Sequence, residues 1–100
     1  MRESDVEKYL VDEVAKRGGI AEKFTSPSRR SVPDRLVQWP SGAMSKFAPT
    51  VVHFVECKAT GEKPTVPQQR DHERRRKMGF TVVVVDSYES VDNYLEVYGP

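Results

Sequence analysis

The sequence predicts an α/β fold in which helices flank one mixed β-sheet, with the elements in the order α-β-β-β-α-β-α. Residues 3–17 carry apolar side chains at helical spacing, and three short segments rich in β-branched and aromatic residues follow them. Four consecutive valines stand in residues 80–86, after a second helical segment. The first strands should be antiparallel, whereas a strand, a crossover helix and the valine-rich strand should form a parallel unit.

Composition sets limits on the function. The chain has 100 residues, a net charge of +1 and 31% charged residues, so we expect one domain spanning residues 1–100 whose total charge demands neither a nucleic acid nor a membrane. Its single cysteine cannot form an internal disulfide, which fits a reducing compartment. The first residues are too charged for a signal peptide, and no apolar run reaches the ~18 residues that span a bilayer. These features predict a cytoplasmic protein without a membrane partner.

The first half of the chain should contain one helix and three strands. The helix at 3–17 ends at Gly18-Gly19, and its apolar positions are Val6, Tyr9, Leu10 and Val14. Weak alternation predicts a strand at 20–25, and the proline, serine and arginine content predicts a loop at 26–33. Strands are expected at 34–39 and 51–57, joined by a long connection at 40–50.

The second half should add a helix, a strand and a closing helix. A polar loop at 60–67 precedes good helix formers at 68–78, which Gly79 ends. The valine run in 80–86 is typical of a strand covered on both faces. The closing helix, 89–97, has Ser87 or Ser90 as its N-cap.

The third strand, within "VVHFVECKATG" (51–61), ends in charge. Because side chains alternate along a strand, Glu56 and Lys58 project on one face and Cys57 on the other. Pro33 precedes Asp34 at the entrance of the neighbouring strand. Taken singly, Glu56 with Lys58 can be a surface ion pair and Asp34 a turn residue. Together, in this order, they resemble the PD-(D/E)xK nuclease pattern.

This pattern suits phosphodiester hydrolysis at a metal. Mg²⁺ and Mn²⁺ accept oxygen ligands, so Asp34 and Glu56 from adjacent strands are the candidate metal ligands, with the backbone carbonyl of Cys57 as a third. Lys58 would orient or deprotonate the attacking water and oppose the charge that builds on the phosphorus. The expected cofactor is therefore Mg²⁺ or Mn²⁺.

Across nearly the whole chain, the sequence resembles the VRR-Nuc family of PD-(D/E)xK nucleases. The matching motifs are "AKRGG" with an acidic residue before it, "VPDRLV", "FVECKATG", "VPQQRDH" and Gly79-Phe80. The resemblance implies a restriction-endonuclease-like fold and a catalytic glutamate in the first helix. Glu3, 15 residues before Gly18, takes that role, and Glu7 is the alternative. It also implies an active-site glutamine, which matches Gln68 better than Gln69.

The helix "RDHERRRKM" departs from the family, which usually places apolar residues there. Either the arginine and lysine stems cover the sheet, or the helix contacts DNA phosphates through Arg74, Arg75, Arg76 and Lys77. His72 shares a helical face with Gln68 and is expected to be structural or hydrogen-bonded. His53 should lie in the core or at an interface, and Cys57 in the core. Arg29, Arg30 and Arg35 flank Asp34 and are candidate DNA contacts.

The resemblance implies a metal-dependent, structure-selective DNA endonuclease. Stand-alone members of this length resemble Holliday-junction resolvases, so branched DNA and a homodimer are the expected partners, in a bacterial or phage-infected cell. Trp39, Phe47 and Tyr98 are candidates for the dimer surface. The alternatives are a flap-specific, restriction-type or nicking nuclease, and a non-catalytic DNA-binding or protein-docking module.

Overall fold

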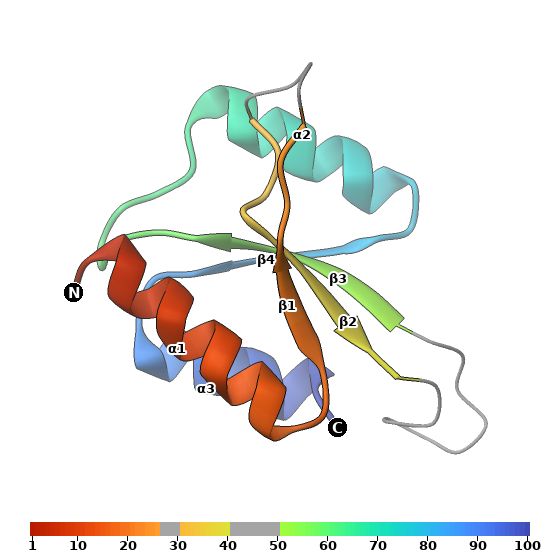
Figure 1. Ribbon diagram of the computed structural model, residues 1–100. Helices are drawn as coiled ribbons and strands as arrows, with labels where there is room; N and C mark the ends of the chain where they lie inside the picture. Colours follow the sequence, from red (N-terminus) through yellow and green to blue (C-terminus); the bar gives the residue numbers. More distant parts are fainter. Residues whose placement is uncertain (27–30, 41–50) are drawn as a thin grey trace.

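A computed structural model of the chain describes residues 1–26, 31–40 and 51–100. The elements follow the predicted order, which is confirmed (Figure 1). They are α1 (Glu3–Lys16), β1 (Ile20–Lys23), β2 (Arg35–Trp39), β3 (Val51–Cys57), α2 (Val66–Lys77), β4 (Thr81–Val85) and α3 (Tyr88–Tyr98). Among the described residues, no helix is long and apolar enough to cross a membrane.

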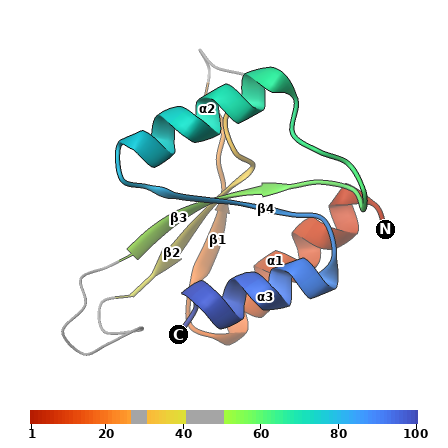
Figure 2. The ribbon, with the colours of Figure 1, turned by 180° about the vertical axis from the view of Figure 1, so that it is seen from behind.

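The four strands form one sheet in the order β1-β2-β3-β4. The pairs β1-β2 and β2-β3 are antiparallel and β3-β4 is parallel, so the predicted mixed sheet is confirmed. Because α2 makes the crossover between β3 and β4, it covers one face of the sheet, while α1 and α3 lie side by side on the other (Figures 1 and 2). The sheet is therefore the middle layer of three.

The main hydrophobic core lies between the sheet and the α1-α3 layer. Its buried members are Val6, Leu10, Val14, Ala21, Val37, Trp39, Val55, Cys57, Val85, Val91, Tyr94 and Leu95. Burial of each Val or Leu side chain contributes about 1.5–3 kcal/mol. His53 belongs to this face as well, with Nδ1 2.7 Å from the Tyr94 hydroxyl. The expected core positions of His53 and Cys57 are thus confirmed.

Trp39 is only 2% exposed, so its expected place on a dimer surface is wrong. Its indole fills the core and its Nε1 donates to the Tyr94 hydroxyl at 3.4 Å. Burying the large ring inside one chain gains more than leaving it for a partner. Of the other two candidates, Tyr98 is 37% exposed and Phe47 lies outside the described residues.

The arginine-rich α2 docks on the opposite face through Arg75. Its guanidinium carbon stands 5.3 Å from the Phe24 ring centroid and 4.6 Å from that of Phe54, within the range of cation-π contact. Arg75 Nε also donates to Asp71 at 2.8 Å, and Arg76 donates to the Val82 carbonyl at 2.9 Å. Stacked and hydrogen-bonded arginines therefore replace the apolar face that this helix lacks.

Two helices begin with capping boxes. Thr65 caps α2, which starts two residues earlier than predicted because Pro67 is tolerated in the first turn. The Gln68 side chain completes that capping box. In α3, Ser87 is the N-cap and Ser90 answers it three residues later, so both predicted serines take part.

Candidate functional site

Glu56 and Lys58 lie at the end of β3, on the face of the sheet that α2 covers. Both are nearly buried, at 1% and 8% exposure, and Lys58 Nζ lies 3.6 Å from Glu56 Oε2. The Lys58 backbone N–H donates to the Val85 carbonyl at 2.9 Å, so pairing with β4 continues past Cys57 and fixes the lysine. A buried ion pair pays a desolvation cost that a surface pair avoids. This pair is thus unlike an ordinary surface salt bridge.

Asp34 enters the same site from β2. Arg35 pairs with Val55, so the next step of the antiparallel register brings Asp34 opposite Glu56 and onto the same face. The Asp34 carboxylate accepts a hydrogen bond from the Cys57 backbone N–H at 2.7 Å. Burial, together with the facing Glu56 carboxylate and, more weakly, Glu3, raises the pKa of Asp34 to about 7.

The raised pKa of Asp34, which faces the Glu56 carboxylate, shows that this pair of acidic groups lacks nearby positive charge. Lys58 supplies one ammonium, and a divalent cation would supply the rest, so the donor chemistry of Asp34 and Glu56 fits Mg²⁺ or Mn²⁺. No group of three or more His, Cys, Asp or Glu residues in the described ranges is placed to hold a metal. Further ligands would therefore be backbone carbonyls such as that of Cys57, and water, which Mg²⁺ retains readily.

His72, which the sequence placed on the helical face of Gln68, lies beside Glu56, a position that the sequence did not predict. It is buried on α2, at 1% exposure, and its Nε2 lies 3.6 Å from Glu56 Oε1. Neither of these two atoms has a hydrogen-bond partner within the described part of the chain. The available signal in the sequence was the place of His72 one turn after Gln68, on the same helical face; Asp71 and His72 are the two buried residues of this helix.

The two candidate glutamates of α1 have different surroundings in the structure. Glu7 binds Arg35, with Oε1 2.7 Å from Nη2, and Lys23 at 3.2 Å. Glu3 is exposed and lies near enough to Asp34 to raise its pKa. The Thr60 backbone N–H, just after Lys58 in the chain, donates to the Met1 carbonyl at 2.9 Å and ties the start of α1 to the site. This geometry favours Glu3.

Gln68 is half-buried, and its side chain forms part of the capping box at the N-terminus of α2. Its Oε1 accepts from the Thr65 N–H at 2.9 Å, while Thr65 Oγ1 accepts from the Gln68 N–H at 3.3 Å. Gln69 is exposed and donates to the Pro64 carbonyl at 2.9 Å. An active-site role for Gln68 stays a prediction, since its amide oxygen is occupied by the cap.

The predicted DNA-contacting residues divide into three groups. Arg29 and Arg30 lie outside the described residues. Arg35, Arg75 and Arg76 bind protein groups, and Arg35 in addition donates to the Ala21 carbonyl at 3.1 Å. Arg74 and Lys77 are exposed on α2. A structural role is therefore visible for three of these cations, and their contact with DNA stays a prediction.

The chain is similar to known proteins over nearly its whole length. A protein described as "Putative nuclease p44", from Acyrthosiphon pisum secondary endosymbiont phage 1, is 53% identical over 89 residues, which are 89% of this chain and 87% of that protein. A solved structure described as "VRR_NUC domain" has a TM-score of 0.83 and 36% identity, covering 98% of this chain and 99% of that chain. The chain belongs to the VRR-Nuc family.

A comparison with models of protein families finds no match, so membership rests on these two relatives. The mixed four-stranded sheet between α2 and the α1-α3 pair is the VRR-Nuc fold, which confirms the expected restriction-endonuclease-like architecture. In this VRR-Nuc protein, Asp34 contacts the backbone next to Glu56, and Lys58 lies beside Glu56; the catalytic role of these three residues stays a prediction.

Proposed function

We propose that this VRR-Nuc protein is a nuclease, and more closely a Mg²⁺- or Mn²⁺-dependent endonuclease that hydrolyses phosphodiester bonds in DNA. Its family and the phage relative named as a nuclease support the class. The observation that carries the mechanism is the half-buried Asp34 facing the buried Glu56, with Lys58 Nζ 3.6 Å from Glu56 Oε2. Such a pair is costly to a fold unless a cation uses it.

In this proposal Asp34, Glu56 and the Cys57 carbonyl hold the metal. The bound ion would supply Lewis-acid stabilisation of a phosphoryl oxygen and a more acidic water. Lys58 Nζ lies 3.6 Å from Glu56 Oε2, and in this proposal its N–H groups would orient the attacking water and oppose charge on the phosphate oxygens. Glu3 at the exposed side would accept the water's proton or bind a second water, and Gln68 would border the site.

His72 acts as a positioning residue in this arrangement. Its Nε2–H can donate to Glu56 Oε1 after a shift of a few tenths of an ångström. That contact would fix the rotamer of Glu56 and leave Oε2 for the cation and Lys58. Residues that hold metal ligands in this way affect affinity almost as strongly as the ligands.

The substrate proposal is branched DNA, with a Holliday junction first among the candidates, cut by a homodimer. It is supported by the family resemblance and by the two-fold symmetry that would present two sites to two strands. Exposed apolar residues on α3, Val97 and Tyr98, are available for a second chain. Sedimentation analysis with and without junction DNA tests the dimer, and a monomer in both states would contradict it.

Cleavage tests the main proposal. Labelled four-way junction, flap and linear duplex are incubated with Mg²⁺ or Mn²⁺ and with wild type, Glu56→Ala or Lys58→Ala. The matched controls are Glu62→Ala and Lys63→Ala, which remove the same charges from exposed positions in the loop before α2. We expect cutting that depends on metal, is lost in the two site variants and persists in both controls, while DNA binding continues in all.

The substrate pattern separates the alternatives. Symmetric cuts in the junction support a resolvase, and cuts only at a flap or in linear duplex support a flap-specific, restriction-type or nicking enzyme. DNA binding without cleavage under either metal would overturn the catalytic proposal in favour of a binding or docking module.

A further inference from the structure

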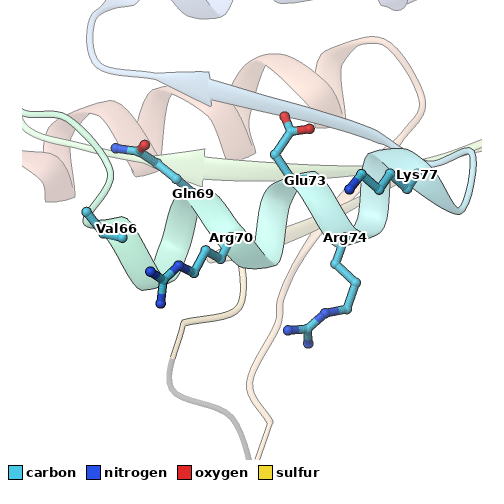
Figure 3. Close-up of a pocket in the computed structure, with 6 residues that line it drawn as sticks. All are labelled: Val66, Gln69, Arg70, Glu73, Arg74 and Lys77. Atoms are coloured by element: carbon cyan, nitrogen blue, oxygen red, sulfur yellow. The ribbon is translucent and has the colours of Figure 1, made fainter.

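The outer face of α2, which we define as Val66, Gln69, Arg70, Glu73, Arg74 and Lys77, lines a shallow surface hollow (Figure 3). Arg70 and Arg74 project from the same side of the helix, and Glu73 projects from the opposite side (Figure 3). Neither the carboxylate site nor the docking of α2 on the sheet uses this face. Beyond the prediction that Arg74 and Lys77 contact DNA, this charged surface therefore has no assigned role.

Its positive charge is unpaired. The helix carries five cations and two carboxylates. Asp71 pairs with Arg75, and Glu73 pairs with Arg76. Arg70, Arg74 and Lys77 form no ion pair within the described residues. The net charge of α2 is therefore more positive than the net charge of the whole chain, which is only +1. An anion that binds here displaces no internal salt bridge.

Helical geometry turns these cations away from the site. Arg70 and Arg74 each lie two residues from His72, which is about 200° around an α-helix, and Lys77 lies about 140° from it. His72 faces Glu56, so the three cations face the side remote from the sheet. With the width of a helix, about 10 Å, between them and Glu56, one phosphate cannot touch both.

We infer that the outer face of α2 binds the sugar-phosphate backbone of a second DNA segment, distinct from the segment that the carboxylate site cuts. The inference rests on the proposed nuclease function. Arg70, Arg74 and Lys77 follow one another every three or four residues, about 4.5–6 Å along the helix axis, and so form a stripe that can follow a phosphate backbone. No base-reading group is needed, because phosphate contacts position DNA without specifying sequence.

The test compares two variants: one removes the three positive charges of the stripe, and the other removes three positive charges elsewhere on the surface. The variant Arg70→Gln/Arg74→Gln/Lys77→Gln is compared with Arg2→Gln/Lys16→Gln/Lys63→Gln, which takes the same charge from exposed sites off this face. Anisotropy titrations in EDTA measure the Kd for a four-way junction and for a duplex of about eight base pairs, over a range of salt. Single-turnover cleavage at saturating protein measures the chemical step.

We expect the stripe variant to bind the junction tenfold or more weakly than the control, with the slope of log K against log salt reduced by about two to three. The short duplex occupies only one surface at a time, so it should lose less affinity than the junction, and the saturated cleavage rate should match the control. Equal losses in both triple variants, or no loss in the stripe variant while the wild type binds and cuts, would overturn the inference and leave the nuclease proposal intact. A wild type that binds DNA without cutting, with the stripe effect present, would overturn the nuclease proposal alone.

Discussion

Glu56 and His72 face each other in the interior of the protein, with Glu56 Oε1 3.6 Å from His72 Nε2. They come from β3 and α2, and among the described residues neither atom has another polar partner. A buried polar atom left unpaired costs about 1–3 kcal/mol, so each atom depends on the other or on a ligand. The contact links the docking of α2 directly to the geometry of the carboxylate site.

Replacing His72 should weaken metal binding. We expect His72→Ala to lower the affinity for Mn²⁺ by about 10- to 100-fold, because Glu56 loses the group that fixes its rotamer. Calorimetric titration of Mn²⁺ into DNA-free protein measures this, and His72→Gln, which keeps a donor, should recover part of the loss. Unchanged Mn²⁺ affinity in a folded His72→Ala protein would contradict the positioning role.

The two glutamates of α1 should respond differently to the same change. Glu3→Gln should lower the cleavage rate without affecting stability, because Glu3 is exposed beside the site. Glu7→Gln should lower the free energy of unfolding by about 1–2 kcal/mol, because Arg35 and Lys23 lose their carboxylate. Urea unfolding and single-turnover cleavage check both, and the reverse pattern would exchange the two roles.

Asp34 should make the metal-free protein less stable as pH rises. Its folded pKa of about 7 lies above the ordinary 3.8, so the native state holds the extra proton and unfolding free energy falls between about pH 4 and pH 7. Asp34→Asn keeps an acceptor for the Cys57 N–H and removes the charge. In EDTA at pH 8 it should be more stable than wild type by about 1 kcal/mol, a figure reduced for partial exposure, while metal binding is lost.

Urea unfolding at pH 5 and pH 8 tests this prediction. The advantage of Asp34→Asn should shrink at pH 5, where the wild-type carboxyl is mostly protonated. A variant that is less stable than wild type at pH 8 would show that Asp34 serves the fold and not a cation.

Adjacent arginines on α2 provide a direct test of how that helix docks. Arg75→Ala should lower the free energy of unfolding by about 2 kcal/mol or more, because it removes the contacts with the Phe24 and Phe54 rings and with buried Asp71. Arg74→Ala, at an exposed position, should change it by less than about 0.5 kcal/mol. Similar losses in the two variants would mean that Arg75 does not anchor the helix.

The order of the elements and the grouping of Asp34, Glu56 and Lys58 could be predicted from the sequence alone. Glu56 and Lys58 share a face because side chains alternate along any strand, and Asp34 meets them because consecutive strands in an antiparallel pair are neighbours. Helix ends also followed local chemistry, as with the serines that cap α3. Each of these features depends on a few consecutive residues or on one adjacent pairing.

The packing of the helices on the sheet determines which other side chains lie next to these site residues. His72 lies beside Glu56, and Arg75 rather than Arg74 packs on the sheet. Glu7 binds Arg35, whereas Glu3 is close enough to Asp34 to raise its pKa. These outcomes depend on how α1 and α2 are rotated against the sheet. That rotation is fixed by packing among side chains far apart in the sequence, which helical periodicity alone does not specify when a helix such as α2 has no apolar stripe.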